Sequence, residues 1–262
     1  MEIKPTVINF AEVGFIVPTL GTRPDYLIEC IRSIKNAGCQ CIFIVGPQTL
    51  ISEIPELEDS QIHLLQDPGE GLTGAINYGV LNLPKEIEFF GWLGDDDLLA
   101  EESILRSLKA FEKVENAVAT YGMCQYISSD GLDIFLNKSG RWAAKFMKFL
   151  PNLIPQPGSL IKRSSFELIG GVRSTYPLSF DFEMFLNLKQ QGKLIFVDQV
   201  QGSFRWHPES LSVDQRNQAV KQTSQIRKNS HSFFIRILSF CWEPIIMRAT
   251  ILMGSNINRR IK

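Results

Sequence analysis

Three consecutive aspartates are the residues of this sequence whose type and spacing best suit chemistry. Asp95, Asp96 and Asp97 directly follow the apolar run "EFFGWLG" at 88–94, which predicts a buried strand. Adjacent carboxylates repel one another, so they need a positive partner. Hard divalent cations prefer carboxylate oxygens and bind through one or two of them plus substrate phosphates. Asp95 and Asp97 could share such a cation while Asp96 turns elsewhere, for instance toward a ribose hydroxyl.

The same three residues also suit a solvated turn that leads into a helix. Aspartate is favoured both in turns and at helix N-termini. The position of the cluster at the end of an apolar strand, rather than between two polar segments, favours a functional site.

Composition and charge set the broad class. The chain has 262 residues, 44% of them apolar and 21% charged, which is ordinary for a globular protein with a full core. With a net charge of −1, the whole-chain field gives no reason to expect a nucleic-acid partner. The N-terminus lacks the pattern of a secretory signal and the five cysteines form no C-x-x-C pair, so we expect a reduced, cytoplasmic protein.

Strand and helix patterns alternate along the first hundred residues. Short β-branched and aromatic runs predict strands at 13–18, 41–46, 61–66 and 88–94. Helical patterns lie between them, and Gly38 marks the end of the first. This order predicts an open α/β sheet, in which ligands bind at the carboxyl ends of the strands. The aspartates lie at that edge.

The pattern changes after residue 100. The sequence predicts a helix over 101–115, a hairpin that turns at 129–131, a turn-rich segment at 151–171, a helix at 180–191 and a strand at 194–199. A polar stretch at 212–230 is typical of a solvated helix or tether, and it leads into an apolar tail.

Six segments in this order resemble the family 2 inverting glycosyltransferases with the GT-A fold. They are "FIVPTLGTRPDYLIECIRSI", "GLTGAINYGV", "FFGWLGDDDLL", "PQPGSLIKRSSFELIGGV", "SFDFEMFLNLKQQGK" and "FRWHPESLS". The resemblance implies a Rossmann-like GT-A catalytic domain at 1–212, a mixed and mostly parallel sheet flanked by helices. Its nucleotide-sugar half would be at about 1–100 and its acceptor half at about 101–212. A C-terminal helical appendage, 213–262, would comprise the tether and an amphipathic tail.

The resemblance implies a nucleoside-diphosphate-sugar as the donor and Mn²⁺ or Mg²⁺ as the cofactor. The loop after the first strand would close over the nucleotide, with contacts from Pro18, Thr19, Gly21 and Arg23. Asp95 and Asp96 would also contact the donor. The cation would be held by Asp95, Asp97 and His207, and it would stabilise charge on the leaving diphosphate.

On the acceptor side, Asp181 matches the position of the family's general base. An inverting transfer needs a carboxylate that takes the proton from the attacking hydroxyl. Glu183 is a second candidate, and Asp181 also suits the start of the helix at 180–191, a role compatible with catalysis. The resemblance further implies acceptor contacts from Gly158, Ser159 and Arg205.

The sequence departs from the family pattern at the base-reading position. The strand at 41–46 usually ends in an aspartate, whereas here Gly46, Pro47 and Gln48 stand there. We therefore expect the base to be read through Gln48 or Asp67. The acidic residue that often precedes the metal motif is also replaced, by a glycine.

The leading interpretation is a metal-dependent inverting glycosyltransferase that acts on a carbohydrate or lipid-linked saccharide acceptor in polysaccharide or glycolipid assembly. A sugar nucleotidyltransferase is the nearest alternative, but "PTLGTRPD" is poor in the glycine that its first loop requires. A non-catalytic carbohydrate-binding protein on a decayed GT-A fold is the third reading.

The tail "SFFIRILSFCWEPIIMRATILMGSNINRRIK" combines large apolar side chains with arginines and a final lysine. This composition predicts peripheral attachment to the inner face of the cell membrane. Packing on the catalytic domain and pairing in a homodimer are the alternatives. Pro244 is expected to break the tail into two short helices, and no stretch reaches the roughly 18 apolar residues of a spanning helix.

Overall fold

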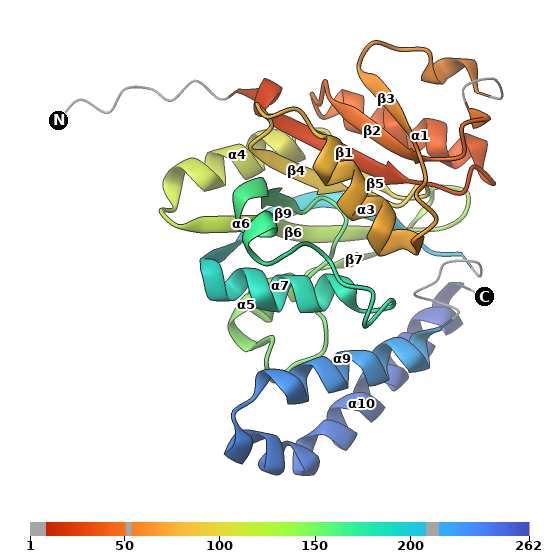
Figure 1. The fold of residues 1–262 in the computed structure, drawn as a ribbon. Coiled ribbons are helices and arrows are strands. Elements are labelled where there is room, and N and C mark those ends of the chain that lie inside the picture. Colours follow the sequence, from red (N-terminus) through yellow and green to blue (C-terminus); the bar gives the residue numbers. More distant parts are fainter. Residues whose placement is uncertain (1–8, 51–53, 208–214, 262) are drawn as a thin grey trace.

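A mixed sheet of nine strands forms the centre of the molecule (Figure 1). The computed structural model describes residues 9–50, 54–207 and 215–261. The strands are β1 (Val13–Pro18), β2 (Ile42–Gly46), β3 (Ile62–Gln66), β4 (Phe89–Trp92), β5 (Leu98–Leu99), β6 (Ala117–Ile127), β7 (Asp133–Asn137), β8 (Leu160–Lys162) and β9 (Lys193–Arg205).

The first four strands form the parallel half of the sheet. The order across the sheet is β3-β2-β1-β4-β8-β6-β9-β5, and β7 pairs with β6. β1 is parallel to both β2 and β4, as the alternating pattern predicted. All six residues of β1 and all five of β2 are buried, because helices cover both faces of this half.

Helices α1 (Pro24–Asn36) and α3 (Gly71–Asn82) accompany the parallel half, and α4 (Ser103–Lys113) packs on β6 and β9 of the other half. In α1 the buried residues Leu27, Cys30, Ile31 and Ile34 recur at helical spacing and join the core on one side of the sheet. The helix ends before Gly38, which has a φ of 94° that favours glycine. The short 3₁₀ turns are η1 (Phe10–Glu12), η2 (Pro55–Leu57) and η3 (Ser139–Trp142).

The second half of the sheet combines antiparallel and parallel pairs. β6 and β7 form the predicted hairpin, β8 is antiparallel to β4 and β6, and β9 runs parallel to β6. The helices of this half are α5 (Ala143–Phe146), α6 (Arg163–Leu168) and α7 (Phe180–Gln191). Leucine, phenylalanine and methionine side chains of α7 pack on this half of the sheet.

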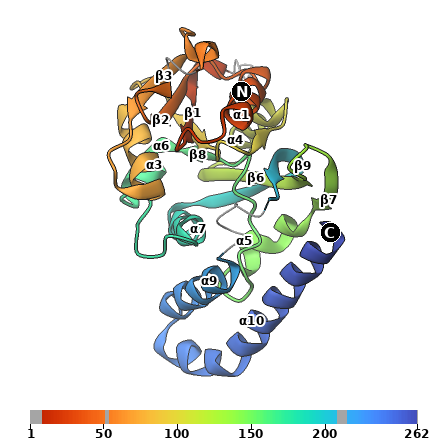
Figure 2. The ribbon, with the colours of Figure 1, turned by 90° about the vertical axis from the view of Figure 1, so that its right-hand side faces the viewer.

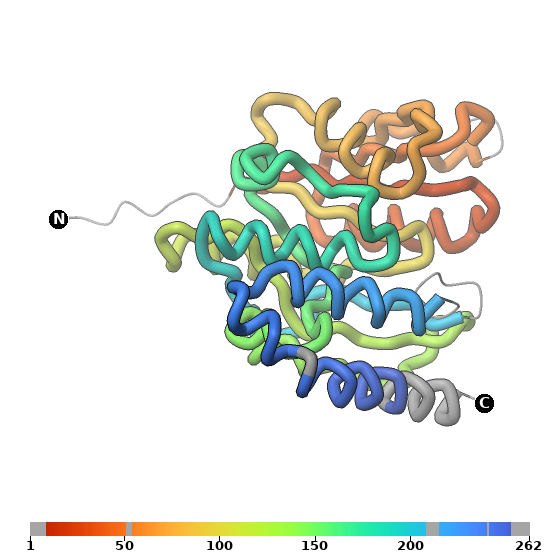
Figure 3. Tube along the Cα trace, turned by 60° about the horizontal axis from the view of Figure 1, so that its bottom comes forward, coloured from red at the N-terminus to blue at the C-terminus, as the bar shows by residue number. Residues whose placement is uncertain are grey.

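Two further helices, α9 (Arg216–Ser230) and α10 (Phe233–Ile261), end the chain. Figure 3 shows α7, α9 and α10 in three successive rows below the sheet. α9 buries Val220 and Ile226, and Ser179 at the start of α7 bonds to Ala219 and Thr223 of α9.

The expected break at Pro244 is wrong. α10 continues through Pro244 as one helix, and it changes direction along its length (Figure 2). Proline removes one backbone hydrogen bond, which bends a helix without ending it when neighbouring turns are held. Here the preceding residue, Glu243, is anchored to α9 by Arg227. No helix among the residues described combines the length and hydropathy needed to cross a bilayer.

Candidate active site

The candidate site lies at the carboxyl ends of β1 and β4, two adjacent parallel strands. β1 ends at Pro18 and β4 at Trp92, and the amide of Leu93 donates to the carbonyl of Ile16. This pairing brings the loop after β1 next to the aspartate loop. The predicted edge of the sheet therefore carries the predicted residues.

Thr19 joins the two loops. Its hydroxyl donates to Oδ2 of Asp95 at 2.5 Å and accepts from the amide of Gly21 at 3.0 Å. Thr19 and Asp95 are both buried. Gly21 has a φ of 77°, so the loop turns sharply after this contact.

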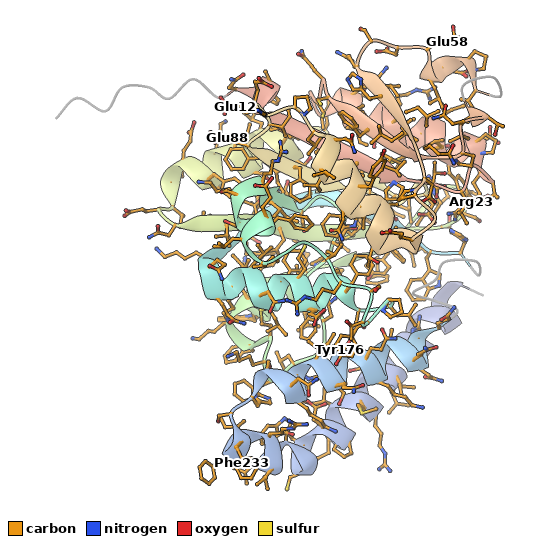
Figure 4. The ribbon with its side chains drawn as sticks, viewed as in Figure 1. Glu12, Arg23, Glu58, Glu88, Tyr176 and Phe233 are labelled. Atoms are coloured by element: carbon orange, nitrogen blue, oxygen red, sulfur yellow. The ribbon has the colours of Figure 1, made fainter. Side chains whose placement is uncertain are left out.

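Arg23 is the positive partner of the aspartates. Its Nη2 lies 2.6 Å from Oδ1 of Asp95 and its Nη1 lies 2.8 Å from Oδ2 of Asp96. The same Nη1 is 2.9 Å from Nε2 of His207, which is itself 2.7 Å from Oδ2 of Asp96. Arg23, Asp95, Asp96 and His207 thus form one contiguous charged cluster. Figure 4 labels Arg23 at the right-hand side of the molecule.

Arg205, at the end of β9, holds the aspartate loop by hydrogen bonds. Its amide donates to Oδ1 of Asp97 at 3.0 Å and its Nε donates to the carbonyl of Asp96 at 2.9 Å. Its Nη2 pairs with Glu29, and its guanidinium lies 4.3 Å from the ring centre of Tyr26. Because Arg205 is only 1% exposed, this place fits a positioning role better than the predicted contact with an acceptor.

Burial makes the charged forms of two aspartates unfavourable. Desolvation raises the pKa of Asp95, and bonds from Thr19 and Arg23 oppose this effect. For Asp97, desolvation and then the neighbouring Asp96 carboxylate raise the pKa well above its ordinary value. The loop therefore holds excess negative charge that a further cation would relieve.

The donor set suits a hard divalent cation, because it consists of carboxylates and one imidazole. The carboxylates of Asp95 and Asp96 already face one cation, the guanidinium of Arg23. Within 9–50, 54–207 and 215–261, however, no three His, Cys, Asp or Glu side chains converge as a ready metal site. Asp97 faces the amide of Arg205, and Asp96 is the carboxylate beside His207.

Asp181 lies in the first turn of α7. In Figure 1 this helix begins on the same side of the molecule as the carboxyl ends of the parallel strands. Oδ2 of Asp181 accepts from Nδ2 of Asn152 at 2.9 Å. Desolvation raises the pKa of Asp181, against hydrogen bonds from the amide of Phe182 and from Asn152. A raised pKa makes a carboxylate a better proton acceptor.

Glu183 lies two residues further along α7, so its side chain leaves the helix in a different direction. Desolvation raises the pKa of Glu183, and the positive charge of Arg173 opposes this effect. Asp181 and Glu183 do not act as one pair, and each remains a separate candidate for the base.

The segment predicted to contact the acceptor is closely packed. Gly158 has a φ of 80°, and a Cβ there would lie 2.2 Å from the carbonyl oxygen of Gln201 in β9. Ser159 is buried and its hydroxyl donates to the carbonyl of Pro155. This glycine thus allows a close approach of two backbones, which explains its presence without an acceptor.

The ends of β2 and β3 carry the residues predicted to read the base. Gly46 pairs with Gln66 across the two strands, and the amide of Asp67 donates to the carbonyl of Gly46 at 3.1 Å. Gln48 is exposed in the following loop, where its amide donates to Oε1 of Gln66. Gln48 and Asp67 therefore lie at the same edge as the charged cluster, one and two strands away from β1.

Sequence reasoning missed three supporting residues. Asn152 holds Asp181, Tyr26 stacks on Arg205, and Gln156 donates from Nε2 to the carbonyl of Trp92 at 2.7 Å. Each acts through a contact distant in sequence, so no local pattern pointed to it.

Fold and site together define an α/β protein that places a carboxylate and arginine cluster at the edge where such sheets bind nucleotides. Residues 15–167, more than half of the chain, match the family Glycosyl transferase family 2. The chain belongs to that family, as its motifs predicted.

Two curated relatives are called uncharacterized glycosyltransferases. The protein of Rickettsia felis is 23% identical over 222 residues, which cover 80% of this chain and 36% of the relative. The protein of Rickettsia conorii is 22% identical with the same coverage. The chain thus spans about a third of the length of these relatives.

Solved structures confirm the fold class. TarS of S. aureus, residues 1–349 in complex with UDP-GlcNAc, superposes with a TM-score of 0.62 at 8% identity, covering 85% of this chain and 68% of that one. The mannosyltransferase PcManGT from Pyrobaculum calidifontis, in complex with GDP-Man and Mn²⁺, gives 0.63 at 12% identity, covering 94% and 73%. At these identities the likeness shows the GT-A type of fold.

Proposed function

We propose that this chain is a metal-dependent inverting glycosyltransferase that moves a sugar from a nucleoside-diphosphate-sugar to a hydroxyl acceptor. The observation that carries the proposal is the cluster in which Arg23 meets Asp95, Asp96 and His207 at the carboxyl edge of the sheet. Side chains that bind cations and a side chain that binds anions lie together there, as the binding of a diphosphate with its counter-ion requires.

The donor would lie across the loops after β1, β2 and β3. Pro18, Thr19 and Gly21 shape the first loop, while Gln48 and Asp67 are the proposed contacts to the base. Arg23 has a planar guanidinium that can leave the carboxylates and pair with phosphate oxygens in the same fork geometry. The buried bond between Thr19 and Asp95 would hold the loop in place meanwhile.

The proposed ligands of Mn²⁺ or Mg²⁺ are Asp95, Asp97 and His207, and the position of Asp96 beside His207 adds this carboxylate to them. When bound, the cation would neutralise charge that develops on the leaving diphosphate. Arg205 would keep the aspartate loop in register through its bonds to Asp96 and Asp97.

In the transfer, the acceptor oxygen bonds to the anomeric carbon as the bond from that carbon to the phosphate oxygen breaks, and the nucleoside diphosphate leaves. Asp181 would take the hydroxyl proton, oriented by Asn152 and favoured as a base by its raised pKa. Glu183 is the second candidate for this role. Gly158, Ser159 and Arg205 would shape the acceptor side from beneath rather than by direct contact.

The nature of donor and acceptor follows by analogy. The similar structures hold UDP-GlcNAc and GDP-Man, which supports a nucleotide sugar here. We propose a carbohydrate or lipid-linked saccharide as acceptor, and a cytoplasmic enzyme that attaches to the inner face of the cell membrane through its C-terminal helices.

A donor panel tests the function. Each of several UDP- and GDP-sugars is added to the full chain with and without Mn²⁺, and thermal unfolding is followed. We expect one donor to raise the midpoint only when the cation is present, since a ligand that binds the native state alone stabilises it by mass action. Hydrolysis of that donor should also depend on the cation. No stabilisation and no hydrolysis across the panel would contradict the proposal.

A further inference from the structure

The outer face of α10 carries an exposed apolar stripe. Phe234 is 77% exposed, Leu238 58%, Ile245 68% and Leu252 63%. Their spacing of four, seven and seven residues places them on one side of the helix. Figure 4 shows Phe233, next to the start of this stripe, at the lower end of the molecule and pointing away from it.

The inner face of α10 carries a buried ion pair. Glu243 is fully buried there and accepts from Arg227 of α9, at 2.8 Å from Nε and 2.7 Å from Nη2, and from Ser224 at 2.6 Å. A helix on a globular protein normally turns its apolar face inward. α10 has apolar side chains on both sides, since Trp242 packs near Phe149 on the inner side, and its outward stripe is available to meet something outside the chain.

Charge indicates what that partner is. Residues 215–262 contain nine lysines and arginines and one acidic residue, the buried Glu243. Residues 134–161 contain four basic residues and no acidic one. The two segments touch, because the tilted rings of Phe149 and Trp242 have centres 6.2 Å apart and Arg227 donates to the carbonyl of Leu150. The rest of the chain holds 14 basic and 27 acidic residues.

A second copy of the chain fits this surface poorly. A two-fold contact would bring the same basic face against itself, with no exposed acidic residue from 215–262 to compensate. An anionic lipid surface supplies both the apolar interior and the opposite charge.

A cavity beside the stripe fits the same partner. It measures about 250 Å³ and lies between α9 and α10. Lys228 and Arg248 line it together with Glu243, whose carboxylate is paired with Arg227, and with the apolar side chains of Pro244, Met247 and Ile251. Two cations over apolar walls suit a phosphate headgroup and the start of its chain.

We propose that α10 lies flat on an anionic membrane, with its stripe of Phe234, Leu238, Ile245 and Leu252 in the headgroup boundary and its basic residues on lipid phosphates. This inference deepens the proposed membrane attachment by assigning its surface, and it does not depend on the transfer chemistry. In Figure 1, α10 runs toward the side on which the parallel strands end, so a membrane along it would border the candidate site.

The test is co-sedimentation of the full chain with vesicles of phosphatidylcholine alone or mixed with phosphatidylglycerol at about three to one. The double variant Leu238→Gln with Leu252→Gln is compared with the matched control Leu81→Gln with Leu168→Gln. The control leucines are 75% and 70% exposed, in α3 and α6, so both variants change two exposed leucines in helices.

We expect the wild type and the control to bind the anionic vesicles and not the neutral ones. The stripe variant should bind them at least about tenfold more weakly, because each leucine contributes buried apolar area. Arg248→Gln should weaken binding at low salt, and this difference from the wild type should shrink as salt is raised, because salt screens the lost charge. Equal binding of both double variants, or equal binding to both vesicle types, would overturn the proposal. So would a stripe variant whose mass by light scattering is smaller than that of the wild type, since this would assign the stripe to a second copy.

Donor-dependent thermal stabilisation is measured on the same variants without vesicles. If the stripe variant loses vesicle binding but keeps this response, the surface is confirmed independently of the site. If wild type and variants alike show no response to any donor while the vesicle result holds, the glycosyl-transfer proposal fails and the membrane proposal stands.

Discussion

At the scale of single residues, the site is organised by the guanidinium of Arg23. It contacts two carboxylates and His207 within 2.9 Å, and so it neutralises a loop that would otherwise hold adjacent like charges. The guanidinium also occupies the position to which these carboxylates would attract a divalent cation. Arginine and cation should therefore compete for the carboxylates until a diphosphate accepts the arginine.

Replacement of Arg23 by glutamine tests this competition. We expect Mn²⁺ to bind the donor-free Arg23→Gln variant about tenfold more tightly, because one positive charge has left the carboxylates. Nucleotide binding should weaken at the same time. Electron paramagnetic resonance of free Mn²⁺ measures the first effect, with Arg32→Gln on the exposed side of α1 as control. Weaker Mn²⁺ binding by the variant would show that Arg23 assists the cation instead.

Asp97 should affect stability and function in opposite directions. Its pKa is raised by burial and by Asp96, so folding favours its protonated form and the charged form costs stability at neutral pH. Asp97→Asn keeps an oxygen for the amide of Arg205 and should raise the free energy of unfolding by about 1 kcal/mol. Cation-dependent donor binding should be lost.

Urea unfolding and the Mn²⁺ thermal shift measure the two effects of Asp97→Asn. Asp130→Asn, in the exposed turn between β6 and β7, should change neither quantity. A less stable Asp97→Asn protein that still binds donor and cation would contradict the role assigned to this carboxylate.

Asp181→Asn should leave donor and cation binding unchanged and lower turnover by about 10²–10⁴-fold, the usual effect of losing a general base. The amide can keep a hydrogen bond to Asn152, so the fold should persist. Thermal shift and the rate of nucleoside diphosphate release are the measurements. Glu183→Gln is the paired variant, and a larger loss of turnover there would move the base to Glu183.

At the scale of elements, the sequence predicted β1, β2 and β3 within one residue at each end, because each is a short apolar run followed by a turn residue. It underestimated β9, predicted at 194–199 and observed at Lys193–Arg205. The added part, which includes Gly202, has no strand pattern of its own. It is extended because β5 and β6 pair with it.

For the candidate site too, the sequence predicted only part of the arrangement. Thr19, Arg23 and the aspartates could be chosen from motifs, since they follow apolar strands in a known order. The burial of Arg205, the packing of Gly158 on Gln201 and the bond from Asn152 to Asp181 depend on which distant segments meet. Single-sequence patterns do not contain that information.

The ion pair of Arg227 and Glu243 should make the stability of the C-terminal helices fall at acid pH. Burial acts to raise the pKa of Glu243, but the bonds from Arg227 and Ser224 outweigh it and the pKa is lowered from 4.5. A carboxyl group whose pKa is lowered in the folded state stabilises the fold at pH values above its ordinary pKa. This stabilisation is lost as the pH falls through the pKa of the folded state. The protection of α9 and α10 amides against exchange, measured relative to the intrinsic rate at each pH, should therefore fall below about pH 4.5.

Glu243→Gln should accelerate this exchange at neutral pH as well. Loss of one partner of a buried pair typically costs about 3–5 kcal/mol, because the other charge is left without compensation. Glu102→Gln removes an exposed partner of Arg106 in the same chain and should have little effect. Equal exchange in the two variants would show that apolar packing, rather than the ion pair, holds α10 on α9.

At the scale of the whole molecule, the net charge of −1 hides a strong separation of charge. The basic segments 134–161 and 215–262 gather at one end, and the acidic remainder holds the candidate site. The native protein should therefore bind a cation-exchange resin at pH 7 in low salt, although its net charge is slightly negative.

Arg248→Gln, which removes an exposed charge from α10, should elute at lower salt than Arg163→Gln, which removes the same charge from α6. Identical elution of the two variants, or passage of the wild type through the column, would show that the separated charges do not act as one surface.

The register shift between β9 and β6 affects how mutations can change this protein during evolution. The first part of β9 pairs with β6 up to Gly122, its last part pairs from Cys124 onward, and the register shifts between these two positions. Arg205 at the end of β9, and His207 just beyond it, both reach the aspartate loop. A single inserted or deleted codon near this shift would turn Arg205 to the other side of the sheet and leave the remaining strands paired. Descendants with such a change would inherit the fold without the site, and β9 is where loss of function in relatives should first be sought.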